Sequence, residues 1–180
     1  MAEISLTPKS PLNGQMTQIE GCSLREIDTL ALTSLAVPLD GDAAFDKALK
    51  KHFGIKRPDA RMSTVKGDVR GISLTPDQLL VLHPMDDGQA DWGSAAYPTD
   101  QTGNWVVLEL SGPRSSDVLE LLCPLDVHPD VFAVGAFART TMEHMSAVLI
   151  RTDEDTFLLL SASSSARTFW HAFEETLSYI

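Results

Sequence analysis

The sequence predicts an α+β protein with mostly antiparallel sheets, built from two pseudo-repeated strand–helix–strand–strand units. Short runs in which apolar and polar residues alternate predict strands, and stretches with apolar residues three or four positions apart predict amphipathic helices. The same order of elements occurs in each half of the chain, which indicates an internal repeat. Because one such unit cannot bury both faces of its sheet, we expect the two units to pack against each other.

The composition is that of a soluble globular protein large enough for one sizeable core. The 180 residues are 43% hydrophobic and 22% charged, which is ordinary. The formal net charge of −11 argues against a broad nucleic-acid-binding face. We expect no membrane segment, because no apolar run approaches the roughly 20 residues that span a bilayer. Two cysteines without a secretory signal indicate free thiols in a cytoplasmic protein.

Residues 1–21 predict an extended N-terminal arm, and residues 22–180 predict a single domain of two similar lobes, at about 22–98 and 103–180. The arm is rich in Thr, Pro, Ser, Asn, Gly and Gln and has too few apolar residues to form a core. Two alternatives stay open. The arm is disordered, or it orders against a partner through apolar residues such as Leu12 and Ile19.

The first unit contains a strand at 28–36 and a well-defined helix. Five apolar residues share one face of this helix: Ala44, Phe45, Ala48, Leu49 and Phe53. Acidic residues near its start and lysines near its end suit the helix dipole, and Gly54 follows the last turn. Residues 56–66 predict a loop. Strands at 69–74 and 79–82 predict a hairpin, and 85–102 is expected to be an irregular seam between the halves.

The second unit repeats this order from residue 105 onward. A strand at 105–110 enters a Ser-Gly-Pro turn, which opens a helix at 115–123, and a linker follows. Two strands, at 147–150 and 156–160, flank an acidic turn. A closing amphipathic helix begins near residue 163 and carries Phe169, Trp170, Phe173 and Leu177 on one face.

No group of residues has the spacing of a catalytic, cofactor or metal site, so we predict none in this chain. The five histidines contain no i, i+4 pair. His171 with Glu174 is a weak candidate for a metal-ligand pair, and both are better explained as solvent-facing residues of a helix. Cys123 ends a helix, whereas nucleophilic thiols favour helix starts, so Cys22 and Cys123 are both expected to be inert. The acidic runs at 86–87 and 153–155 lack the alternating ligands of a calcium loop and predict solvated turns.

One basic cluster stands out in this acidic chain. Six of the 14 basic residues lie within 15 positions: Lys47, Lys50, Lys51, Lys56, Arg57 and Arg61. A solvated helix end with Asp46 and Asp59 as ionic partners explains the cluster most simply. The sharper hypothesis is a docking patch for an acidic partner surface, which would steer association and weaken with salt.

A series of short segments along the chain carries a family resemblance. In the second half these segments are 105–113, the helix 118–123 with Pro124-Leu125-Asp126, the segment 131–140, Ile150-Arg151, 157–159, Ser165-Ala166-Arg167 and Trp170. Upstream, Ser10-Pro11-Leu12, Arg25-Glu26, Pro76-Asp77 and 80–82 belong to the same series. In these segments the chain resembles the gamma subunits of heterotetrameric sarcosine oxidases. The resemblance covers most of 10–175, and its specificity comes from the order and spacing of many weak matches.

The resemblance implies a small subunit without an active site in a cytoplasmic flavoenzyme that oxidatively demethylates sarcosine to glycine. In such enzymes the partner alpha and beta subunits carry NAD, FAD and FMN, tetrahydrofolate accepts the one-carbon unit, and a delta subunit completes the complex. The gamma subunit would contact the alpha subunit directly. The resemblance also implies a fold similar to the folate-binding region of glycine-cleavage aminomethyltransferases.

The alternative is a free-standing folate-binding or one-carbon-transfer protein of the aminomethyltransferase type. Such a protein needs a carboxylate that holds the pterin ring inside a central cavity. Glu109, in the middle of a strand, and Asp126 are the nearest candidates.

Overall fold

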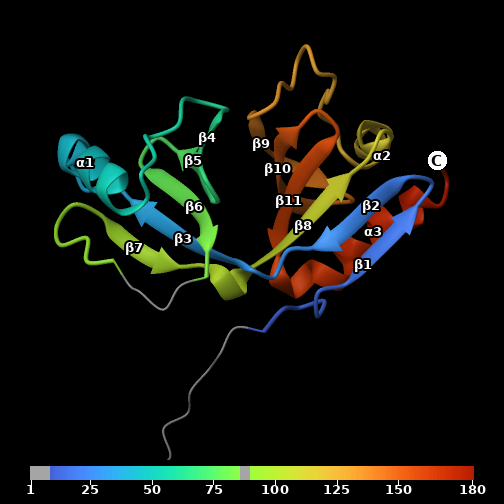
Figure 1. Cartoon of the computed structure of the whole chain (residues 1–180), viewed down its shortest axis with the longest axis horizontal. Helices are drawn as coiled ribbons and strands as arrows, with labels where there is room; N and C mark the ends of the chain where they lie inside the picture. The colour runs from blue at the N-terminus through green and yellow to red at the C-terminus, as the bar shows by residue number, and fades with distance from the viewer. Residues whose placement is uncertain (1–8, 86–89) are drawn as a thin grey trace, which may run out of the picture.

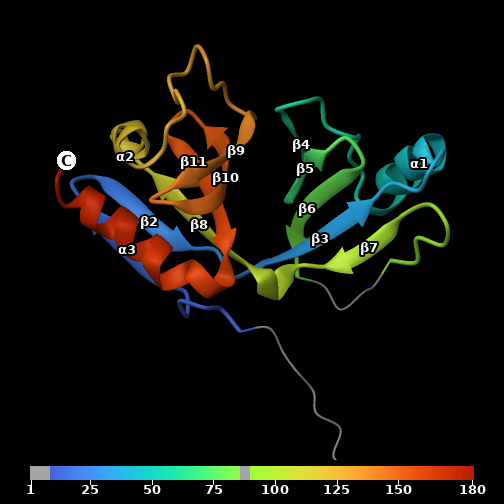
Figure 2. The same cartoon turned by 180° about the vertical axis from the view of Figure 1, so that it is seen from behind.

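The computed structural model describes residues 9–85 and 90–180, and these form two β-sheets whose inner faces pack together (Figure 1). Every strand pair is antiparallel. Helices cover the outer face of each sheet, as both views show (Figure 2). The predicted α+β class with antiparallel sheets is therefore confirmed.

The smaller lobe holds a five-stranded sheet of order β4-β5-β6-β3-β7. Its elements are β3 (Leu30–Ala36), α1 (Asp42–His52), β4 (Ser63–Lys66), β5 (Val69–Thr75), β6 (Gln78–Pro84) and β7 (Tyr97–Asp100). Helix α1 lies on the outer face, where Phe45 and Leu49 are fully buried against the sheet. The predicted helix and the predicted hairpin at 69–82 are both present.

The larger lobe holds a six-stranded sheet of order β1-β2-β8-β11-β10-β9. Its elements are β1 (Met16–Ile19), β2 (Cys22–Glu26), β8 (Trp105–Ser111), α2 (Ser115–Leu122), β9 (Phe137–Met142), β10 (Met145–Asp153), β11 (Thr156–Ala162) and α3 (Ala166–Leu177). Helix α3 buries the predicted aromatic face, with the Phe169 and Phe173 rings edge to face at 5.2 Å. Within the described residues, no helix is long and apolar enough to cross a membrane.

The internal repeat is real, and each copy has one strand more than the sequence predicts. β3-α1-β4-β5-β6 and β8-α2-β9-β10-β11 give the same strand order in the two sheets. Even local details repeat: the Val37 amide donates to the Asp77 carbonyl, and Gly112 donates to Asp155 at the equivalent corner. The extra strands are β4, where a loop was predicted, and β9, where a linker was predicted. Both are partly exposed strands rich in polar residues, so their apolar pattern is weak.

The two copies exchange their edge strands. β2 directly precedes β3 in the chain but pairs with β8, and β7 directly precedes β8 but pairs with β3. The larger lobe therefore includes residues 16–26, which differs from the expected arm at 1–21 and the expected lobe boundary near 22. The reason is burial, because Cys22 and Leu24 are fully enclosed in the core of the larger lobe.

The segment before β1 is held by a buried carboxylate. Glu26 accepts hydrogen bonds from the Ser10 hydroxyl and from the Leu12 and Gly14 amides, and Leu12 is buried. The seam at 85–102 also contributes structure. It provides β7, and Trp92 is buried beside α1. Asp86 and Asp87, predicted as a solvated acidic turn, lie outside the described residues.

Candidate functional site

The predicted docking patch is divided between two places. Lys47, Lys50 and Lys51 lie together on the exposed side of α1, at the outer end of the smaller lobe (Figure 1). Lys56 is exposed in the loop that follows. Arg61, also exposed, has a left-handed backbone with φ of 63°, and its carbonyl accepts a hydrogen bond from Phe137 of the larger lobe. Arg61 therefore lies at the junction of the lobes.

Arg57 has a structural role within the patch. Its guanidinium donates to Asp42 at 2.7 Å and to Asp46 at 2.9 Å, and it lies over the Phe45 ring at 4.9 Å. These contacts fasten the loop after α1 to the helix. Both partners belong to α1, so the charge of Arg57 is already paired with carboxylates of this chain. The docking hypothesis therefore depends on the four lysines and Arg61.

A cleft of about 360 Å³ lies between the lobes and contains one of the two folate-type candidates, Glu109. The Glu109 carboxylate accepts a hydrogen bond from Arg25 Nε at 2.7 Å, and this bond raises the pKa of Arg25. Arg25 thus occupies one of the two carboxylate oxygens of Glu109. Asp126 is exposed in the loop after α2 and accepts the His128 amide. The structure therefore does not bring the two carboxylates together around one cavity.

The charges in this cleft are balanced. Its lining includes Arg25, Arg70, Asp68 and Glu109, together with apolar side chains such as Leu158. Arg70 donates to the Ser63 hydroxyl at 2.7 Å, and burial lowers its pKa. With two residues of each sign, the formal charge of the lining sums to zero, so the lining alone does not select a ligand by charge.

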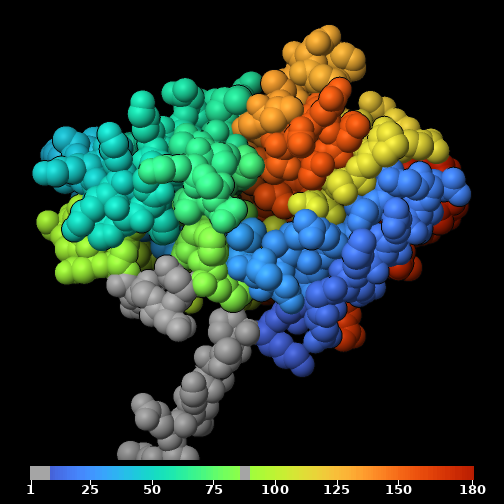
Figure 3. Space-filling model, in the orientation of Figure 1, coloured from blue at the N-terminus to red at the C-terminus, as the bar shows by residue number. Residues whose placement is uncertain are grey.

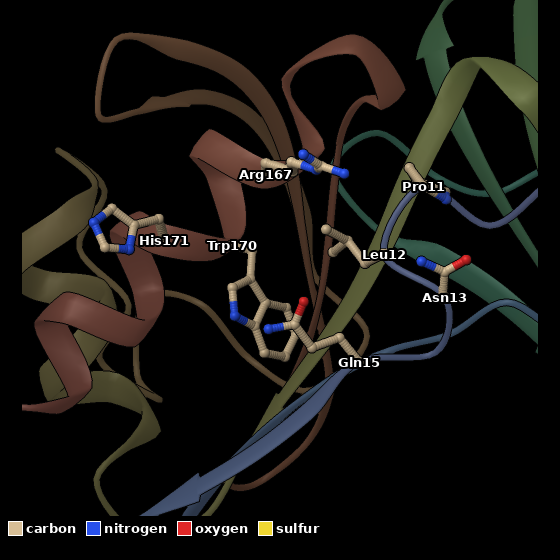
Figure 4. A pocket seen from close by; sticks show the side chains of 7 residues that line it. All are labelled: Pro11, Leu12, Asn13, Gln15, Arg167, Trp170 and His171. Carbon is tan, nitrogen blue, oxygen red and sulfur yellow. The ribbon is translucent and has the colours of Figure 1, made fainter.

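A second cavity, of about 340 Å³, lies between the N-terminal loop and α3 (Figure 4). Gln15 and Trp170 both line it, and Arg167 and His171 project from α3. The Trp170 indole nitrogen is buried and has no hydrogen-bond partner among the described residues. His171 is exposed and lies 4.0 Å from Glu174, so this pair behaves as a surface contact. Across residues 9–85 and 90–180, no three His, Cys, Asp or Glu side chains converge as metal ligands.

The sequence reading missed the loop between α2 and β9. Its apolar side chains point both ways: Phe132 is buried, whereas Val131 is 65% and Val134 is 52% exposed. Arg151, a buried residue of β10, stabilises the loop by donating hydrogen bonds to the Val127 and Phe132 carbonyls at 3.1 and 3.0 Å. The run of apolar residues between Asp130 and Gly135 was the available signal.

Both cysteines are free and buried, Cys22 completely and Cys123 at 7% exposure, and burial raises the pKa of Cys123. We expect the folded chain to react with a thiol reagent such as Ellman's reagent more slowly than the urea-unfolded chain, by a factor on the order of a hundred or more. Cys22→Ala and Cys123→Ala variants assign each reaction phase. Fast labelling of either native thiol would contradict this inertness.

The comparisons with known proteins agree with this fold. A sequence model described as the sarcosine oxidase, gamma subunit family matches residues 39–178. The sarcosine oxidase subunit gamma of Corynebacterium sp. (strain P-1) is 32% identical over 152 residues, covering 79% of this chain and 73% of that protein. A chain of the heterotetrameric sarcosine oxidase from Corynebacterium sp. U-96 has the same fold, with a TM-score of 0.79 over 95% of both chains at 23% identity.

The expected likeness to aminomethyltransferases is also confirmed at the level of fold. The glycine cleavage system aminomethyltransferase T from Bartonella henselae superposes with a TM-score of 0.58 at 12% identity, covering 93% of this chain and 57% of that chain. Because the family model matches most of the chain and the Corynebacterium sp. (strain P-1) subunit is 32% identical to it, the chain belongs to the sarcosine oxidase gamma subunit family.

Proposed function

We propose that this chain is the gamma subunit of a heterotetrameric sarcosine oxidase, which oxidatively demethylates sarcosine to glycine and passes the one-carbon unit to tetrahydrofolate. The observation that carries the proposal is the family match over residues 39–178. In this proposal the chain stabilises the assembly and contributes no catalytic residue. The alternative of a free-standing folate-binding protein has less support, because Glu109 is engaged by Arg25 and Asp126 lies outside the cleft.

The partners and cofactors follow from the same proposal. The alpha subunit makes the direct contact, the beta and delta subunits complete the complex, and the alpha and beta subunits carry NAD, FAD and FMN. The complex is cytoplasmic. The absence of a glycine-rich phosphate-binding fingerprint in this sequence supports placing the dinucleotides in the partners.

The test is to isolate the tagged chain from its own cells and to record the absorbance of what copurifies. We expect a yellow complex with much larger chains that oxidises sarcosine. A colourless chain that elutes alone and gains stability on titration with tetrahydrofolate would instead favour the folate-binding alternative.

The lysines on α1 supply the long-range part of the docking in this proposal. Exposed charges mainly change the association rate, so changing Lys47, Lys50 and Lys51 to Glu should slow incorporation about tenfold at low ionic strength, with little difference at high salt. The measurement is the rate at which labelled full-length chain exchanges into the purified complex.

The matched control reverses three exposed arginines on the larger lobe, Arg114, Arg139 and Arg167, to Glu. This control changes the net charge in the same direction at a different place. Equal slowing by both variants would show that net charge alone matters and would contradict a specific role for α1.

A further inference from the structure

We propose that the loop between α2 and β9, together with Met62, forms a docking tip that inserts into an apolar socket with a charged rim on the large partner subunit. The docking tip consists of Met62, Val131, Ala133 and Val134, with Arg61 beside it. This inference rests on the proposed function, because it names the surface through which the subunit binds its complex.

The docking tip is apolar and stands out from the molecule. Val131, Val134 and Met62 are 65%, 52% and 37% exposed, and Ala133 between the two valines is also exposed. Figure 3 shows the orange loop as the part of the larger lobe that projects farthest at the top of this view. Clustered exposed apolar residues are typical of protein–protein contacts, whereas single ones are ordinary.

Both lobes build the tip. The Ser63 amide donates to the Gly135 carbonyl at 2.7 Å, and the Phe137 amide donates to the Arg61 carbonyl at 2.9 Å. These bonds flank an isolated bridge between Met62 and Ala136, which are equivalent positions of the two repeats. The tip therefore lies where equivalent positions of the two repeats meet. Its shape depends on the two lobes being packed together.

Contacts within the chain hold the tip in its shape before any partner binds. Buried Phe132 anchors it from within, Arg151 binds the Val127 and Phe132 carbonyls, and the His128 carbonyl accepts the Val131 and Phe132 amides at 2.9 and 2.8 Å. Ordering a flexible loop on binding costs free energy, and a loop that is already ordered avoids this cost. Such preorganisation suits a permanent docking element.

Shape and charge indicate the partner. Two convex tips would bury little area against each other, and each would bring its own Arg61, so a second copy of this chain is a poor occupant. A concave apolar surface on a larger chain fits the projecting valines. At its rim an acidic group would pair with Arg61, and a basic group would pair with Asp130, which is 89% exposed beside Val131. An apolar centre with a charged rim is the usual anatomy of a stable interface.

The experiment is a competition inside cells. Wild-type and variant chains with different tags are coexpressed with the other subunits, and the ratio of the tags in the purified oxidase measures relative incorporation. We expect the double variant Val131→Asp, Val134→Asp to incorporate at least about tenfold less than wild type, because central apolar contacts carry most of the binding energy. Leu39→Asp and Tyr179→Asp, at positions 94% and 76% exposed outside the docking tip, should incorporate normally.

Thermal unfolding of the isolated chains checks that the variants fold. If the double variant unfolds early, Arg61→Glu, which changes one exposed side chain, replaces it and should still reduce incorporation several-fold. Equal incorporation of the tip variants and wild type would overturn the docking tip and leave the proposed function standing. Failure of wild type to enter any oxidase would overturn the proposed function itself. A wild-type dimer that the variant converts to a monomer, with incorporation unchanged, would assign the tip to self-association and overturn the proposal.

Discussion

Replacing Gly112 with alanine is expected to lower the free energy of unfolding by about 3–5 kcal/mol, since a strained backbone and a steric clash combine. Gly112 follows β8 with φ of 122°, a conformation that L residues rarely adopt. A Cβ atom there would lie 2.5 Å from the Gly21 carbonyl oxygen and 2.8 Å from Cys22 Cα. Both are backbone atoms of the β1–β2 hairpin, so no side-chain rotation relieves the clash, and the exchanged strand β2 must move.

The measurement is the urea midpoint of the isolated chain, followed by circular dichroism and tryptophan fluorescence. Gly103→Ala is the matched control, because a Cβ atom at Gly103 meets nothing within 4 Å, and its effect should stay within about 0.5 kcal/mol. Equal midpoints for the two variants would show that the hairpin yields easily and would contradict the clash argument.

Replacing Arg151 with methionine should also cost about 3–5 kcal/mol, because several buried carbonyls lose their donor at once. Arg151 is 2% exposed, lies over the Phe157 ring at 5.1 Å and donates to the Val127, Phe132 and Glu154 carbonyls. Its hydrogen bonds join the β10–β11 turn to the loop that carries the docking tip. Methionine keeps most of the apolar stem, so the loss reports on the guanidinium, through its hydrogen bonds and its contact with the Phe157 ring.

The control is Arg139→Met on the neighbouring strand β9, where the side chain is exposed and the change should lie within about 0.5 kcal/mol. Hydrogen exchange adds a local test. The Val131 and Phe132 amides should exchange faster in Arg151→Met than in wild type even below the unfolding transition. Unchanged protection of these amides would mean that Arg151 stabilises only the β10–β11 turn.

The sequence predicted the central elements well because their environment is simple. β6 and β11 are covered on both faces, so they appear as continuous apolar runs, and α1 and α3 each bury one face, so they show helical periodicity. The repeat followed from the order of these elements. Family membership was also accessible, through many short matches along the chain.

Other features escaped because their residues carry little apolar pattern. β4, β7 and β9 are edge strands, each of which pairs with one neighbouring strand only. The four residues of β7 are all exposed. β1 was assigned to an arm because none of its four residues is buried, so it shows little apolar pattern. β2 was assigned to the wrong lobe because its pairing with β8 spans more than 80 residues and leaves no local signal. Of the predicted basic cluster, Arg57 proved to be tied to α1 by Asp42 and Asp46.

The sequence by itself determined the α+β class, the duplicated order of elements and the family, because these depend on local periodicity and on the order of short matches along the chain. Only the tertiary structure decided that the edge strands are exchanged, that Glu109 is paired with Arg25, and that Met62 lies beside the loop of the second repeat. These features depend on contacts between residues far apart in the chain, where packing of the two sheets, and not local propensity, sets the lowest free energy.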